Sequence, residues 1–168
     1  MLQNVNELFL HDLADMYDAE FQFLQAMHEM VQKVNEPKLQ EMINKHIQET
    51  EQQIRNLDQV FGLLDAKPRR AECDGAKGII QEGQKTVLMA QDNPMLLDVV
   101  IAGALDKSEH YEIAAYTQLV CFAQMLNNQE ILKLLQQNLQ QEEKTSQALE
   151  YFSPPMLQKS IASGQQVR

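Results

Sequence analysis

Apolar residues recur along four long stretches of this chain at steps of three, four or seven positions. Steps of this size keep side chains on one face of a helix. They predict helices over residues 5–34, 37–64, 94–126 and 129–152, each with an apolar face directed at a common core. The apolar positions are Phe9, Leu13, Met16, Phe23 and Met27, then Leu39, Met42, Leu57, Val60 and Leu64, then Leu105, Leu119, Ala123 and Leu126, and finally Leu132, Leu135, Leu139 and Leu149.

Short turns join the first helix to the second and the third to the fourth, so each pair is expected to form an antiparallel hairpin. Pro37 suits the start of the second helix, and Asn93-Pro94 predicts the start of the third. Between the hairpins, residues 65–93 are richer in glycine and are expected to hold short helices, such as Asp74–Met89. A crossover of this length lets the third helix lie parallel to the second. The pattern therefore predicts an all-α, antiparallel four-helix bundle in up-down-down-up order.

The chain is expected to form one domain. Its 168 residues, 44% of them hydrophobic, are enough for a single core. Pro154 and Pro155 should stop the last helix, because proline lacks an amide proton and disfavours helix in the residue before it. We therefore expect the bundle to span residues 1–155 and residues 156–168 to form a polar C-terminal tail.

Charge and composition narrow the partners and the location. The net charge of −10 at pH 7 argues against nucleic acid or an anionic membrane as a partner. No apolar run approaches the roughly 18 residues of a membrane span, and the first residues are too polar for a secretory signal. Cys73 and Cys121 fit no zinc or redox spacing. The expected location is the cytoplasm, with both thiols reduced.

Each predicted helix also carries glutamate on its apolar face, near the middle of its length. These positions are Glu20, Glu49, Glu109, Glu112 and Glu142. A buried, unpaired carboxylate is unfavourable, so it protonates or finds a partner. One interpretation is a pair of metal ions held between the four helices. The alternatives are glutamates that face solvent, a dimer interface or a polar network in the core.

Two more polar side chains lie on these faces. His46 precedes Glu49 by one turn, and it could ligate a metal, hydrogen-bond a ligating carboxylate, or have a structural role alone. Tyr116 follows Glu112 by one turn, and it could donate a hydrogen bond to a carboxylate, transfer an electron if the metals are redox active, or pack in the core. The spacing does not choose among these roles.

Several segments match a known pattern in order and spacing over residues 3–150, and the most specific of them is Glu109–Tyr116, EHYEIAAY. In these segments the sequence resembles the YciE/YciF-type family of ferritin-like, stress-associated bacterial proteins. The other matching segments are Leu13–Glu20, His46–Thr50, Leu57–Phe61, Cys73 ahead of a glycine-containing helix, Leu134-Leu135, Leu139 and Glu142–Thr145.

The resemblance implies a ferritin-like four-helix bundle whose core holds two iron or manganese ions. It also implies which side chains would bind them, since bridging carboxylates suit both metals. The implied ligands are Glu20 from the first helix, Glu49 from the second, Glu109 and Glu112 from the third, and Glu142 from the fourth.

The chain departs from the usual ligand pattern at four positions. Typical di-iron bundles carry Glu-x-x-His on two helices, and here Gln52 and Thr145 occupy the histidine positions. Relatives often have histidine where Gln53 stands and aspartate where Ser146 stands. Gln53 offers only a neutral amide oxygen, and the Ser146 hydroxyl is a weaker ligand still. These changes could lower metal affinity, open a coordination position, or mark a site that has lost its metal.

Two functions remain open on the sequence alone. The first is a di-metal oxidoreductase or metal-handling protein that removes peroxide or dioxygen or oxidises ferrous iron. The second is a non-catalytic stress or assembly protein with a degenerate or metal-free site. A homodimer is expected in either case, because bundles of this kind often pair.

Overall fold

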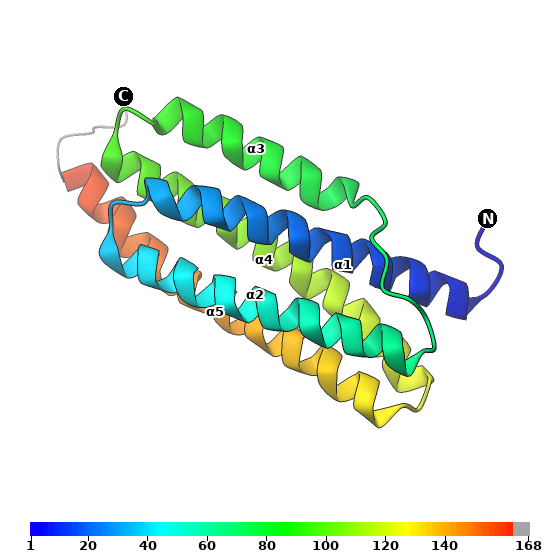
Figure 1. The fold of residues 1–168 in the computed structure, drawn as a ribbon. Coiled ribbons are helices and arrows are strands. Elements are labelled where there is room, and N and C mark those ends of the chain that lie inside the picture. Colours follow the sequence, from blue (N-terminus) through cyan, green and yellow to red (C-terminus); the bar gives the residue numbers. More distant parts are fainter. Residues whose placement is uncertain (163–168) are drawn as a thin grey trace.

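The four apolar faces become four long helices that lie lengthwise against one another (Figure 1). The computed structural model describes residues 1–162. Their helices are α1 (Val5–Met30), α2 (Pro37–Leu63), α3 (Asp74–Ala90), α4 (Pro94–Met125) and α5 (Gln129–Ala162), with a short 3-10 helix (Val31–Lys33) after α1.

The connections produce the predicted order of the helices. α1 and α2 form one antiparallel hairpin and α4 and α5 form the other, while α2 and α4 run in the same direction (Figure 1). The crossover between the hairpins contains α3, which packs on α1 and α4. The prediction of an all-helical bundle with a long crossover is therefore confirmed.

The predicted end of the last helix is wrong. α5 continues through Pro154 and Pro155 to Ala162, so the expected boundary at residue 156 falls inside this helix. The two prolines leave the carbonyls of residues 150 and 151 without their usual donors, but both residues are exposed and these carbonyls can bond to water. Beyond the prolines, Met156 is buried against the core and compensates for the lost bonds. Residues 163–168 of the expected tail lie outside the described residues.

The apolar core consists of two clusters, one toward each end of the bundle. A layer of buried polar side chains separates them at mid-length, where the predicted glutamates lie. One cluster includes Phe9, Leu13, Leu57, Leu119 and Leu135, and the other includes Met27, Leu39, Ile101, Leu105 and Leu149.

A buried aspartate fastens the crossover to α1. Asp18 accepts hydrogen bonds from the backbone N–H of Cys73 at 2.9 Å and from Arg70 Nε at 2.6 Å. Burial alone would raise the pKa of Asp18, but the bonds from Cys73, Gln22 and Arg70 together hold it below its ordinary value. Asp18 is therefore a charged anchor for the segment that leads into α3.

A second buried aspartate ties α4 to the turn between α1 and α2, and its removal should destabilise the fold. The Asp98 carboxylate accepts the backbone N–H groups of Asn35 at 2.8 Å and Glu36 at 2.9 Å. Asp98→Ala leaves both donors unpaired and should lower the free energy of unfolding by about 1–3 kcal/mol. Urea denaturation measures this change. Asp98→Asn keeps one acceptor oxygen and should show a smaller loss, and equal stability of all three proteins would contradict the role of this contact.

Candidate metal centre

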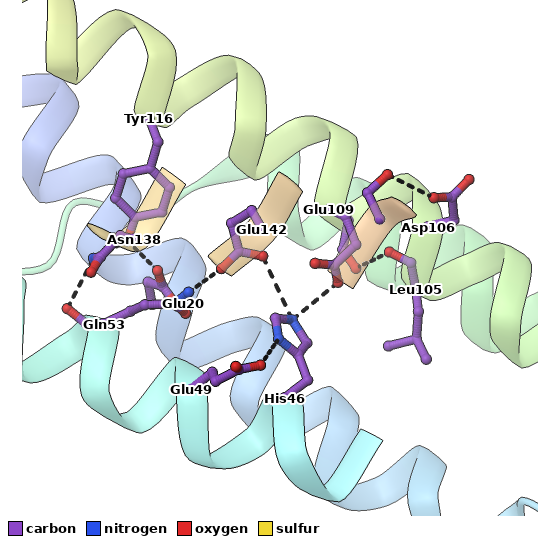
Figure 2. Close-up of polar contacts among 12 residues, drawn as sticks. Glu20, His46, Glu49, Gln53, Leu105, Asp106, Glu109, Tyr116, Asn138 and Glu142 are labelled. Carbon is purple, nitrogen blue, oxygen red and sulfur yellow. Dashed lines mark hydrogen bonds and ion pairs between the residues drawn. The ribbon is translucent and has the colours of Figure 1, made fainter. Parts of the chain in front are cut away.

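Polar side chains from all four bundle helices meet in the layer between the two apolar clusters (Figure 2). Helix periodicity turns each of them inward, and each is almost completely buried. The structure thus brings four of the five predicted glutamates to one level. The residues of this acidic layer are Glu20 from α1, His46 from α2, Glu109 and Glu112 from α4, and Glu142 from α5.

Four members of the layer form a compact group, called the four-donor group here. His46, Glu109, Glu112 and Glu142 each offer one ligand atom, and these atoms all lie within 4.8 Å of one another. His46 Nε2 lies 3.0 Å from Glu109 Oε1 and 3.7 Å from Glu142 Oε2. Such a cluster has the donors and the size to surround one cation.

Little positive charge lies beside the glutamates of the acidic layer. Within residues 1–162, no lysine or arginine forms an ion pair with its glutamates, and only His46 faces them as a potential cation. Burial raises the pKa of Glu109 to about 8, although a contact with Glu142 partly opposes this and the charge of Glu20 adds to it. Burial likewise raises the pKa values of Glu20, Glu112 and Glu142 well above their ordinary range.

Several buried atoms of the layer have no hydrogen-bond partner in the part of the chain that the structure describes. Such atoms are uncommon in folded proteins, and each calls for an explanation. Carboxylate oxygens with one imidazole nitrogen form a hard donor set that suits iron or manganese. The donors present therefore fit these ions. The unpartnered atoms include Glu20 Oε2, Glu109 Oε2, Gln53 Oε1 and His46 Nδ1, whereas Glu109 Oε1 and Glu142 Oε2 form their contacts with His46 Nε2.

Glu49, the fifth predicted glutamate, lies at the edge of the layer and outside the four-donor group. Its side chain is 21% exposed and forms an ion pair with Lys45 at 3.0 Å. Its Oε2 lies 3.9 Å from His46 Nδ1. A ligand role for Glu49 stays a prediction, and His46 takes the place on α2 that the sequence analysis assigned first to Glu49.

The other predicted polar residues have distinct partners. Gln53 donates from its amide nitrogen to Glu142 Oε1, so it fixes a carboxylate of the layer. Ser146 does not contact these carboxylates. It lies one turn after Glu142 on α5, and its hydroxyl donates to Asp106 Oδ1 of α4 at 3.2 Å. Whether Gln53 or Ser146 ligates a metal stays open.

Tyr116 forms the hydrogen bond that its spacing allowed, because its hydroxyl donates to Glu20 Oε1. Two buried asparagines that the sequence analysis did not consider continue from it. Asn138 donates to the Tyr116 hydroxyl at 2.9 Å, and Asn56 donates to Asn138 at 2.7 Å. A signal was present for Asn138, because it stands three positions after Leu135 on the apolar face of α5.

A narrow pocket reaches the four-donor group between α2, α4 and α5. Its volume is about 10 Å³, which is space for about one water molecule. His46 and Glu109 form part of its wall, and the remaining lining residues are mostly apolar. They are Met42, Ile43, Leu105, Thr145 and Leu149.

Comparisons with known proteins agree with this fold. A domain family described as "Domain of unknown function (DUF892)" matches residues 4–162. The chain is 31% identical over 145 residues to protein YciF of Escherichia coli strain K12, and the match covers 86% of this chain and 87% of YciF.

Two solved structures resemble this one over most of its length. The crystal structure of the E. coli stress protein YciF matches with a TM-score of 0.88 and 30% identity, over 94% of this chain and 99% of that chain. YcfI, a candidate structural protein from Rhodopseudomonas palustris, matches with a TM-score of 0.85 and 34% identity, over 88% of this chain and 94% of that chain. Among the described residues, no helix has the length and apolar character required to cross a membrane.

Proposed function

This chain belongs to the DUF892 family, which is described only as a domain of unknown function. From its site we propose that the bundle core holds a di-metal centre of iron or manganese. The observation that carries this proposal is the set of buried carboxylate oxygens without partners. Several carboxylates at one depth are unfavourable without a cation, and metal ions supply the missing charge.

The side chains of the acidic layer offer donors for two ions. The four-donor group would hold the first ion through three carboxylates and the His46 imidazole. Glu20 would offer its free Oε2 to the second ion. The apolar clusters on both sides exclude water, which strengthens the electrostatic attraction between ligands and ions.

The reactant that suits this centre is small. The pocket beside His46 and Glu109 has room for about one water molecule, and an organic substrate does not fit it. Two adjacent Fe or Mn ions, when bound, supply one electron each to the reduction of peroxide or dioxygen. We therefore propose oxidation chemistry with a small oxidant, in keeping with a role in stress.

Metal analysis tests this proposal. Protein produced in metal-replete medium and purified without chelator should contain about two iron or manganese ions per chain, measured by plasma mass spectrometry. Anomalous scattering at the iron and manganese edges should locate them beside Glu109 and Glu142. When the protein is loaded with ferrous iron, added peroxide should oxidise the bound ions. Less than about one tenth of the expected metal content would rule the proposal out.

A second candidate function is a structural protein without metal. Burial raises the pKa values of the glutamates, so the acidic layer could persist in protonated, neutral form. The relative YcfI, a candidate structural protein, favours this possibility. It predicts that the purified protein contains no metal and that chelator leaves its melting temperature unchanged, whereas a large decrease with chelator excludes it.

A further inference from the structure

A line of hydrogen bonds leads from the acidic layer toward the surface of the bundle. It begins at Glu20, whose Oε1 accepts the hydroxyl hydrogen of Tyr116. Asn138 Nδ2 donates to the Tyr116 oxygen at 2.9 Å, and Asn56 Nδ2 donates to Asn138 Oδ1 at 2.7 Å. Figure 2 shows Tyr116 and Asn138 beside Glu20. All four of these residues are buried, and they come from four different helices.

The line continues along α2 to an exposed cation. Gln52 Nε2 donates to Asn56 Oδ1 at 2.9 Å. Arg55 donates to Gln52 Oε1 from Nε at 3.2 Å and from Nη2 at 3.0 Å. Every bond in this line has its donor on the side of Arg55 and its acceptor on the side of Glu20. We call Tyr116, Asn138, Asn56, Gln52 and Arg55 the amide series.

The direction of the amide series is fixed at two points. Arginine has only donors, so Gln52 must present its oxygen to Arg55 and its nitrogen to the next residue. Asn138 Nδ2 also donates to the backbone carbonyl of Gln53 at 3.3 Å, and a carbonyl can only accept. The nitrogen of Asn138 therefore faces Tyr116, and the single hydroxyl hydrogen of Tyr116 is directed to Glu20.

We propose that the amide series is a positioning device that holds Glu20 for the second metal ion. It occupies Oε1 of Glu20 and leaves Oε2, which has no hydrogen-bond partner, to bind the ion. Tyr116 and Asn138 are thus positioning residues that act through Glu20. This inference rests on the proposed di-metal function and assigns a role to residues outside its ligand set.

The polarity of the series also favours negative charge on Glu20. Hydrogen bonds that run in one direction polarise one another, and their dipoles add at the end of the series. Here the positive end of each dipole points toward Glu20, and Arg55 adds a full positive charge at the far end. An arrangement of this kind stabilises a carboxylate in one orientation.

Manganese titration of two variants tests the role. Asn138→Leu interrupts the series at its centre, and Tyr116→Phe removes only the hydroxyl that reaches Glu20. In both variants the first ion should bind as in the wild type, because the four-donor group is intact. The second ion should bind about 10–100-fold more weakly. Electron paramagnetic resonance should then show isolated Mn²⁺ at loadings where the wild type shows a coupled pair.

Leu135→Ala is the matched control, because Leu135 is equally buried and lies one turn from Asn138 on α5. It should lower the melting temperature without changing the affinity for either ion. Equal weakening in Leu135→Ala would overturn the inference, because the effect would then follow from lost packing. If the wild type binds two ions and both variants, Asn138→Leu and Tyr116→Phe, bind them with unchanged affinity, the inference is wrong but the proposed function stands. A wild type that takes up no manganese or iron overturns it together with the proposed function.

Discussion

Glu109→Gln should change metal binding and stability in opposite directions. The substitution removes the buried carboxylate whose Oε1 lies 3.0 Å from His46 Nε2. Loss of a direct ligand should weaken metal binding by more than the roughly 10–100-fold typical of residues that only support a ligand. Equilibrium dialysis against Mn²⁺ measures this loss.

The same variant should be more stable than the wild type when both are free of metal. Burial raises the pKa of Glu109 to about 8, so folding at pH 7 must either protonate this carboxyl or bury its charge. Glutamine has nearly the same shape and avoids that penalty, which is roughly 3 kcal/mol at pH 7. Urea denaturation in the presence of chelator measures the gain.

Glu143→Gln provides the control for both measurements. Glu143 is exposed and adjacent to Glu142 in the sequence, so its substitution removes a carboxylate outside the acidic layer. It should leave the metal affinity and the free energy of unfolding nearly unchanged. If Glu109→Gln bound manganese as tightly as the wild type, the assignment of Glu109 as a ligand would be wrong.

The chelated protein should lose stability as the pH rises from about 5 to about 8. Burial raises the pKa of Glu109 from 4.5 to about 8, and it raises the pKa values of Glu20, Glu112 and Glu142 in the same direction. The folded state then holds more protons than the unfolded state. The resulting stability is complete below the unfolded pKa and is lost as the pH passes through the folded pKa. Urea denaturation at a series of pH values measures the slope.

The metal-loaded protein should lack this decline. Its ligands must be deprotonated, so metal binding releases protons and strengthens as the pH rises. The contribution of Asp18 does not interfere, because its lowered pKa causes a loss of stability only at pH values below 3.8. The double variant Glu109→Gln/Glu142→Gln, measured with chelator, should show a shallower slope than the wild type. Parallel pH profiles for chelated and metal-loaded wild type would contradict a cation in the acidic layer.

The sequence predicts the helices well because their periodicity reports directly on burial. The periodicity does not always tell which of two neighbouring residues faces the core, as Glu49 and Thr50 show. A step of three from His46 reaches Glu49, and a step of four reaches Thr50, so either can face the core. In the structure Thr50 is buried and Glu49 is partly exposed beside Lys45. The helix period of about 3.6 residues, together with that surface cation, decides between them.

Contacts between distant segments explain what the sequence could not predict. The partners of Asn138 lie on α2 and α4, and nothing in the local pattern of α5 indicates them. The continuation of α5 past Pro154 has the same origin. Local proline chemistry predicts an end, but burial of Met156 against the second apolar cluster outweighs it. Both outcomes depend on tertiary packing, which overrides local propensity.

The proposed ligands are divided between the two hairpins, and this division would also affect a part of the molecule that supplies none of them. His46 belongs to the first hairpin and Glu109 to the second, and the crossover with α3 connects them. A cation bound to both residues closes a covalent loop through that connection, so it acts as a cross-link that restricts the chain between them. α3 packs on α1 and α4. Release of the ion would therefore raise the entropy of the unfolded chain across the whole crossover, including α3, and so destabilise the fold.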